Sequence, residues 1–488
     1  MANLGVHIYE QATSVSTPLV ADSGIPFVAG LAPSHAAASP GKAYTPVLCT
    51  SWKEAVEKLG FSYDWDTYTL CEFMYSHFQL FGCQPVIFCN VFDHTKMQKA
   101  GEAKDYDVAE HKISIPFETV HNEKLIVTCV KKSGADDPIT EDNVLAEDED
   151  YSVLYDEDEN ACIIELLPSS DYYLTAATLH VEGQVVEFSQ IDEKDIVRGL
   201  GVIDECMTVV GKIPDLICAP GYSHITTVVA VMATKAAGIN GLFHGKALID
   251  IDSSPEGCTE YSHLTYHKNK NNFIDENQIV CWPMVKLGDY KFHLSTQLAG
   301  LMAKVDTDNA GCPYESPSNK ALKIDGCCLA DGTEINLTFE QVNIIAGDYG
   351  IVTALNFMSM GWTAKGNYVG CYPANTDVKD YFIPVSRMFD WIGNTLIRTF
   401  WSKLDLPMTK RLLDTIQDTC SIWLNGLVSS EILLGARVEI LGEENPVTSL
   451  MAGIIKIHIY ITPPSPAQEI DFVLEYDPDY VTSALLSE

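Results

Sequence analysis

The most constraining feature of the sequence is an alternating segment close to its C-terminal end, residues 469–476. One face of this segment would carry Ile470, Phe472, Leu474 and Tyr476, and the other Glu469, Asp471, Val473 and Glu475. This period of two is typical of a β-strand with one buried face. Eight extended residues span about 27 Å, and the Pro-rich residues 463–466 before them form a stiff spacer. We therefore predict a terminal strand with a long reach.

A shorter β-prone segment lies at the other end of the sequence, in residues 4–10. At its centre are Val6, His7, Ile8 and Tyr9. A terminal strand can pair within its own domain, or it can complete an exposed sheet edge in a neighbouring copy. The spacer at the C-terminal end allows the second arrangement without proving it.

A third alternating segment, residues 453–462, is the natural acceptor for such strands. Ile455, Ile457, Ile459 and Ile461 would lie on one face of it, opposite Lys456, His458 and Tyr460. We predict one long strand here, with a regular edge that could pair with arms from other copies.

Composition limits the class of protein. At 488 residues the chain exceeds a single core, and we expect roughly two to four domains. We find neither a secretory signal nor an 18-residue apolar run, so we expect no export by the general pathway and no membrane insertion. The 15 cysteines are scattered, without C-x-x-C or zinc spacing, which favours a reducing cytoplasm.

The charge is strongly acidic and unevenly distributed. The net charge of −36 argues against nucleic-acid binding. Residues 135–160 are acidic without one basic residue, and we interpret them as a solvated rim. Residues 381–411 instead carry five basic and two acidic residues, including Lys403, Lys410 and Arg411. This contrast indicates a face that meets an acidic partner.

The order of patterns along the chain predicts an α/β fold with an inserted β domain and an α+β C-terminal domain. Buried strands are expected at residues 25–30, 85–91 and 216–218, and helices at 68–81 and 228–237. Short alternating segments between residues 105 and 188 predict a β-barrel or sandwich. The predicted divisions are an N-terminal arm (1–20), a discontinuous core (21–104 and 190–362), the insert (105–189), a C-terminal domain (363–462) and a C-terminal arm (463–488).

One segment resembles a catalytic motif. Ser223 lies between a predicted strand and helix, where a hydrolase nucleophile would lie, but Ile225 replaces the second glycine of that motif. The side chains that could be considered as its catalytic-triad partners are His244, Asp250 and Asp252. We interpret Ser223 instead as a helix N-cap. The sequence offers no phosphate-binding loop, so we predict neither catalysis nor a cofactor nor a metal.

Several stretches together resemble the tail sheath proteins of contractile-tailed bacteriophages. They include Ala219-Pro220-Gly221-Tyr222-Ser223-His224, Trp282-Pro283-Met284-Val285-Lys286, Tyr372-Pro373-Ala374-Asn375-Thr376-Asp377 and Thr462-Pro463-Pro464-Ser465-Pro466-Ala467. Others are residues 24–28, 68–81, 317–320, 387–391, 423–427 and 443–446. The likeness covers nearly the whole chain in order, and only the insert is weakly marked.

The resemblance implies a structural, non-enzymatic subunit with a subtilisin-like core. Such subunits form stacked hexameric rings around a tail tube and contract to drive it through the bacterial envelope. Both arms would add strands to a neighbour's C-terminal domain, and Lys403, Lys410 and Arg411 would approach the tube. The implied partners are other copies, the tube protein, and baseplate and tail terminator proteins, in a virion tail assembled in the host cytoplasm.

Three alternatives remain open at this point. The first is the sheath of a phage-derived bacteriocin or contractile injection system, which the sequence hardly separates from a phage sheath. The second is a cytoplasmic serine hydrolase that uses Ser223. The third is a monomeric binding protein.

Overall fold

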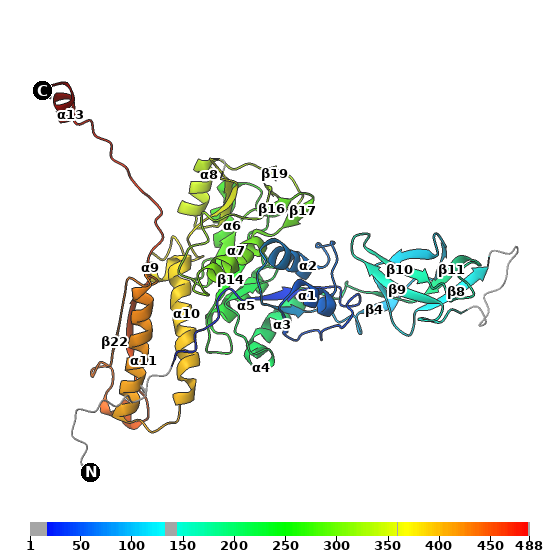
Figure 1. Cartoon of the computed structure of the whole chain (residues 1–488), viewed down its shortest axis with the longest axis horizontal. Coiled ribbons are helices and arrows are strands. Elements are labelled where there is room, and N and C mark those ends of the chain that lie inside the picture. Colours follow the sequence, from blue (N-terminus) through cyan, green and yellow to red (C-terminus); the bar gives the residue numbers. More distant parts are fainter. Residues whose placement is uncertain (1–16, 132–143, 359, 487–488) are drawn as a thin grey trace, which may run out of the picture.

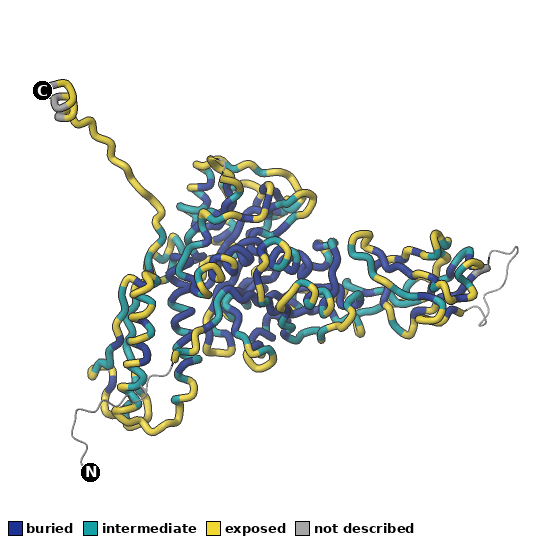
Figure 2. Tube along the Cα trace, in the orientation of Figure 1, coloured by how far each residue is buried: buried dark blue, intermediate teal, exposed yellow. Residues whose placement is uncertain are grey.

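The computed structural model describes residues 17–131, 144–358 and 360–486. A central α/β body carries a β lobe on one side and a long helical hairpin on the other (Figure 1). The C-terminal segment leaves the body as an extended chain and ends in a short helix. Buried residues concentrate in the body, whereas this segment is exposed along its length (Figure 2).

The centre of the α/β body is a six-stranded sheet with the order β15-β14-β13-β1-β3-β2. Only β2 runs antiparallel to its neighbour. The five parallel strands are buried throughout, as expected for a sheet covered on both faces. The bounds of all six strands are β1 Pro26–Gly30, β2 Val47–Cys49, β3 Val86–Asn90, β13 Leu216–Cys218, β14 Lys246–Asp250 and β15 Gln278–Cys281.

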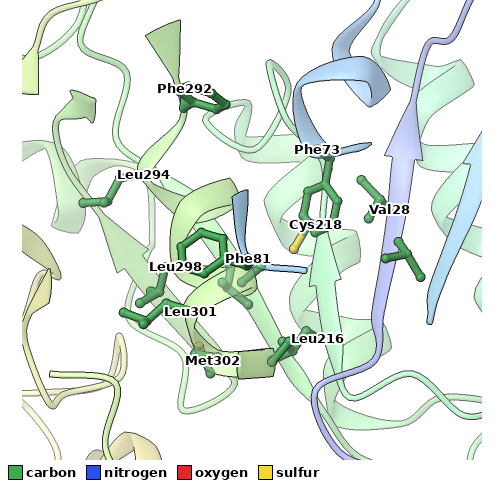
Figure 3. Packing of buried hydrophobic residues seen from close by; sticks show 14 of the residues in the cluster. Val28, Phe73, Phe81, Leu216, Cys218, Phe292, Leu294, Leu298, Leu301 and Met302 are labelled. Carbon is green, nitrogen blue, oxygen red and sulfur yellow. The ribbon is translucent and has the colours of Figure 1, made fainter. Parts of the chain in front are cut away.

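Helices cover both faces of this sheet because its apolar residues point to both sides. Val28 and Cys218 pack with Phe73 and Leu298 in one core (Figure 3), whereas the adjacent Phe27 belongs to the opposite core. The first face is covered by α2 (Thr69–Met74), the π-helix η1 (Tyr75–Leu80) and α7 (Leu294–Asp308), and the second by α3 (Glu193–Gly201) and α5 (Thr226–Ala237).

The β lobe is formed by the chain between β3 and α3. Its strands form three three-stranded sheets. Two of them, β6-β10-β9 and β5-β11-β8, enclose a core that includes Ile113, Cys162 and Leu179. The third, β4-β12-β7, packs through Val120 and Val186 on a core of the α/β body. The bounds are β4 Gln98–Ala100, β5 Lys104–Asp107, β6 Lys112–Pro116, β7 Thr119–Val120, β8 Ile126–Lys131, β9 Tyr151–Asp156, β10 Ala161–Leu166, β11 Ala176–Glu182 and β12 Gln184–Val186.

The helical hairpin consists of α10 (Ile383–Phe400) and α11 (Lys410–Ser429). A two-stranded antiparallel sheet, β22 (Gly435–Glu439) with β23 (His458–Thr462), packs against it. Met388, Trp391 and Leu424 lie at the centre of this smaller core.

The remaining elements complete the body and the C-terminal region. They are α1 Trp52–Leu59, η3 Val202–Glu205, α4 Cys206–Val209, η4 Tyr261–His263, α6 Leu264–Lys270, β16 Met284–Leu287, β17 Tyr290–Phe292, β18 Gly326–Cys328, β19 Glu334–Ile335, α8 Phe339–Asn343, η5 Ile344–Asp348, β20 Thr353–Asn356, β21 Trp362–Lys365, α9 Val378–Tyr381, η6 Trp401–Lys403, α12 Val447–Met451 and α13 Asp479–Leu486.

The mixed α/β architecture and its main strands agree with the sequence predictions, but the acceptor strand is shorter than predicted. It begins at His458, and residues 454–457 lie outside any strand. The reason is Asn445, whose side chain accepts a hydrogen bond from the N–H of Lys456 (2.7 Å) and donates to its carbonyl (2.9 Å). A side-chain amide thus replaces β22 at this position. The domain boundaries and the subtilisin-like core stay predictions.

Candidate assembly surfaces

Within the part of the chain that the structure describes, the predicted C-terminal strand pairs with no other strand. Residues 469–476 have no strand assignment, and the exposed fractions of Phe472 and Leu474 are 85% and 94%. The base of the arm is held to the body, where the Tyr368 hydroxyl donates to Gln468 Oε1 at 2.7 Å. Helix α13, which the alternation did not predict, follows the extended residues. Its Tyr480 and Leu485 are also exposed.

The sheet β22–β23 has one apolar and one polar face. Ile459 and Ile461 pack with Val438 against the helical hairpin. On the opposite face, the Arg437 guanidinium lies 3.7 Å from the centre of the Tyr460 ring, and Tyr460 stacks on His458. Within the described ranges, β23 pairs with β22 alone. Its second edge is therefore free of any strand from the described part of the chain.

The chain enters the body along α10, through residues 19–23. The N–H groups of Leu19 and Ala21 donate to Thr399 Oγ1 (2.9 Å) and Thr395 Oγ1 (3.0 Å), and Trp391 Nε1 donates to the Ala21 carbonyl. These contacts fix the direction from which the preceding residues arrive. The predicted N-terminal arm residues Val6, His7, Ile8 and Tyr9 lie outside the described residues.

A buried ionic junction connects the helical hairpin to the α/β body. Arg387 of α10 donates to both carboxylate oxygens of Asp306 (3.0 and 2.5 Å) and to Asp215 Oδ2 (2.8 Å). The side chains of Arg387 and Asp306 are 4% and 0% exposed. Burial alone lowers the pKa of Arg387, but the two carboxylates outweigh it and raise the pKa. Arg387 therefore remains charged and ties the two parts together.

This junction corrects the interpretation of the basic stretch, because Arg387 is buried and neutralised rather than offered to a partner. The charges that remain on the surface are Lys403, Lys410 and Arg411 at the turn between α10 and α11, where Lys403 is half-buried and the other two are exposed. None of them forms an ion pair with the described residues. Four exposed apolar side chains lie beside these charges, and the sequence analysis did not predict them. They are Trp401, Leu404, Leu406 and Met408.

Ser223 does not cap the helix that follows it. It is fully buried, and its hydroxyl donates to Asp250 Oδ2 at 2.6 Å. Asp250 also accepts from the hydroxyl and the N–H of Ser295. The N-cap of α5 is Ile225, so the predicted cap at Ser223 is wrong.

Of the three residues considered as triad partners, Asp250 bonds to Ser223, whereas His244 and Asp252 have other partners. His244 is held through its backbone by Asn394, and Asp252 bonds to Ser254. The hydroxyl of Ser223 therefore bonds directly to a carboxylate, without a histidine to take its proton.

A histidine–carboxylate pair lies close to Asp250, with Glu72 buried and the His293 side chain 20% exposed. His293 donates through its backbone N–H and, as imidazolium, through Nδ1 to the two oxygens of Glu72 (2.7 and 2.8 Å). Burial opposes the charge on His293, but Glu72 outweighs burial and raises the pKa to about 9. Together with His224 and Asp252, His293 lines a cavity of about 260 Å³.

The His293–Glu72 pair makes stability depend on pH. Because the pKa rises from 6.5 to about 9 on folding, its stabilisation is complete below about pH 6.5 and is lost as pH rises through 9. The contribution is at most roughly 3 kcal/mol. Between pH 6.5 and 9.5, the free energy of unfolding should fall less for His293→Asn than for the parent protein. Denaturant titration at each pH measures this difference. Equal losses would contradict this assignment.

The described residues contain no group of His, Cys, Asp and Glu side chains arranged to hold a metal ion. Among the helices described, none has the length and apolarity needed to span a membrane. All 15 cysteines are buried, and burial raises the pKa of Cys49 to about 12.

Comparison with known proteins gives matches in sequence and in structure. No protein-family model matches the chain. A tail sheath protein of Burkholderia phage BcepMu is 24% identical over 294 residues. The match covers 58% of this chain and 59% of that relative, so the chain aligns with little more than half of the relative's length.

Two solved structures match almost the whole chain. The helical sheath of the anti-feeding prophage in its contracted state has a TM-score of 0.58 at 14% identity, and covers 98% of this chain and 100% of that one. The sheath complex of the extracellular contractile injection system PVC, also contracted, has a TM-score of 0.57 at 15% identity, with 98% and 99% covered. At these identities the likeness establishes the fold.

Proposed function

We propose that this chain, which has the fold of contractile tail sheath proteins, is the structural subunit of a sheath that polymerises around a tail tube and contracts. The observation that carries the proposal is the C-terminal arm. It presents an apolar, strand-like face to solvent, while the same chain contains a two-stranded sheet with a free edge in the described ranges. A donor and an acceptor that are separate in one copy can pair between copies.

The apolar face of the arm supplies the driving force for assembly. Burying Ile470, Phe472, Leu474 and Tyr476 would contribute roughly 6–12 kcal/mol before the cost of ordering the arm. A head-to-tail contact whose rotation does not close on itself gives a helical polymer. Arms paired between copies would keep neighbours joined while the bodies move from an extended to a shortened lattice. This action requires neither catalysis nor a cofactor.

The partners follow from the same proposal. Stacked hexameric rings would bring the basic turn of the helical hairpin towards the tail tube, and the ends of the sheath would meet baseplate and terminator proteins. The particle would be assembled in the cytoplasm of a host bacterium and would use contraction to drive the tube through a bacterial envelope. The N-terminal arm would join a neighbour in the same way as the C-terminal one.

A sheath of a contractile injection system remains the second candidate, because the matched solved structures come from such systems. Capsid and terminase genes beside the gene for this chain would indicate a phage, and their absence an injection particle. The hydrolase alternative loses its basis, since Ser223 is buried and bonded to Asp250.

Electron microscopy of the purified chain tests the proposal. We expect rings or tubes in negative stain, and fast-sedimenting material at high protein concentration. A monomer that persists at the highest concentrations would reject the sheath function and favour a monomeric binding protein.

The tube-facing role of the basic turn leads to a separate prediction. Changing Lys403, Lys410 and Arg411 to Glu should weaken co-assembly with the tube about tenfold, since each exposed charge pair contributes about 0.2–1 kcal/mol. Self-assembly should survive. The matched control makes the same charge change at three exposed lysines of the α/β body, Lys42, Lys53 and Lys323. Unchanged tube binding by the first variant, measured by co-sedimentation, would remove this role.

A further inference from the structure

Three tyrosine rings from separate parts of the sequence meet on the surface of the α/β body. Tyr63 comes from the loop between α1 and α2, Tyr75 from η1 and Tyr290 from β17, and Figure 1 shows β17 on the side of the body from which the β lobe projects. The ring centres of Tyr63 and Tyr290 are 5.2 Å apart in a stacked arrangement. The ring centre of Tyr75 lies 6.1 Å from that of Tyr63 and 6.0 Å from that of Tyr290. Tyr290 is 36% exposed, so a partner can reach this cluster.

Two carboxylates of the β lobe lie beside the tyrosine cluster. They belong to Glu157 and Asp158, in the turn between β9 and β10. This turn is fixed to the body because Ser62 Oγ donates to Asn160 Oδ1 at 2.9 Å. Burial is the largest cause that raises the pKa of Tyr63, and the charges of Asp158 and Glu157 add to it, so both carboxylates lie close to this ring. Within the described ranges neither carboxylate forms an ion pair, although burial and the adjacent acidic residues already raise the pKa of Glu157.

Aromatic rings beside carboxylates favour a cationic group. The face of a ring attracts positive charge, and a carboxylate accepts charge-assisted hydrogen bonds. A guanidinium suits both, because it is flat enough to stack on a ring and carries five N–H donors. The chain already contains this contact twice. The guanidinium of Arg198 lies 4.0 Å from the centre of the Tyr44 ring, and that of Arg437 lies 3.7 Å from the centre of the Tyr460 ring.

The arginines of the chain itself have other positions. Of the five in the sequence, Arg198 and Arg437 lie on tyrosine rings, and Arg387 and Arg398 form ion pairs with carboxylates. The remaining one, Arg411, would face the tail tube in the proposed function. A guanidinium at the tyrosine cluster therefore comes from a different protein.

We propose that Tyr63, Tyr75 and Tyr290, together with Glu157 and Asp158, form a recognition surface for an arginine side chain of a second protein in the assembly. The choice of this partner rests on the proposed function, whereas the recognition surface itself does not. The body supplies the rings and the lobe supplies the carboxylates, so the partner would contact both parts at once.

Peptide titration of the full-length protein tests the recognition surface. The peptide acetyl-Gly-Arg-Gly-amide should bind in the millimolar range, as followed by ligand-observed NMR, and its counterpart with Lys should bind about threefold more weakly. Changing Glu157→Gln and Asp158→Asn together should weaken binding of the Arg peptide about tenfold. The matched control changes Glu102→Gln and Glu123→Gln, at two exposed carboxylates of the same lobe, and should have little effect. Equal weakening by the two double variants would overturn the recognition surface.

Substitutions of Tyr290 test the contribution of the ring. Tyr290→Phe keeps the ring and should bind the Arg peptide within about twofold of the parent, whereas Tyr290→Leu removes it and should weaken binding about threefold. The thermal unfolding midpoint of each variant shows that the fold is retained. Equal affinities of the Phe and Leu variants, or no binding by the parent protein, would contradict the role of the rings.

Polymerisation tests the choice of partner separately. If Arg411 of a second copy occupied the surface, Arg411→Gln and the double variant of Glu157 and Asp158 would both raise the critical concentration for polymerisation. We expect both variants to polymerise as the parent does, and a raised critical concentration in both would overturn the assignment to a second protein. Absence of polymer from the parent would instead reject the sheath function, while peptide binding would still decide the recognition surface.

Discussion

Deletion of residues 467–488 should leave a folded protein that no longer polymerises. Residues 469–476 belong to none of the sheets formed by the described residues, and their apolar side chains are 70–94% exposed. Their removal therefore costs the isolated subunit little beyond the Tyr368–Gln468 hydrogen bond. The thermal unfolding midpoint should be unchanged, whereas sedimentation should show only small species at concentrations where the parent protein forms tubes.

Single substitutions on the arm separate its two faces. Leu474→Asp places a charge on the apolar face and should reproduce most of the effect of the truncation. Val473→Asp is the matched control, because Val473 lies on the acidic face and is equally exposed. Normal tubes from the truncated chain would show that the arm is not the connection between subunits.

Replacing Arg387 by Met should lower the free energy of unfolding by about 3–5 kcal/mol. The substitution leaves the carboxylates of Asp306 and Asp215 without their cation, in a place where Asp306 is fully buried. It also removes one connection between α10 and the α/β body, while the contacts of Asp390 with Lys246 and of Asn394 with His244 remain. We therefore expect a lower thermal unfolding midpoint, together with faster limited proteolysis of the helical hairpin.

Two further variants distinguish the effect of breaking the buried junction from the effect of removing any positive charge. Arg437→Ala removes an arginine whose side chain is 61% exposed, and it should change stability by less than about 0.5 kcal/mol. Combining Arg387→Met with Asp306→Leu should recover part of the loss, because an apolar pair can replace a buried ion pair. A single variant as stable as the parent would show that the junction does not hold the two parts together.

The sequence predicted best those elements whose pattern depends on neighbours in the chain. The buried strand Leu216–Cys218 has the predicted bounds, and the strand predicted at residues 25–30 is β1. The helix predicted at residues 68–81 is present, but its second half is a π-helix. Apolar spacing could not distinguish these two forms, because they differ by one position in the hydrogen-bond partner.

The errors came from polar side chains that act across the fold. The hydroxyl of Ser223 bonds to Asp250 on a neighbouring strand instead of capping the helix. Asn445 reaches Lys456 and ends the strand pairing early. Arg387 was grouped with surface cations because its two carboxylate partners are 81 and 172 residues away in the sequence. These interactions depend on which distant residues meet in the folded chain, and a local sequence pattern does not contain that information.

Helix α10 has a mechanical consequence if copies are joined by their ends. The entering segment bonds to Thr399 near one end of this 18-residue helix, and the base of the C-terminal arm bonds to Tyr368, which bridges to Phe382 at the other end. The two attachments are thus separated by about 27 Å of continuous helix. A tensile force between successive subunits would be transmitted along the axis of α10, which Arg387 anchors to the body. The force produced during contraction would therefore bypass the central sheet.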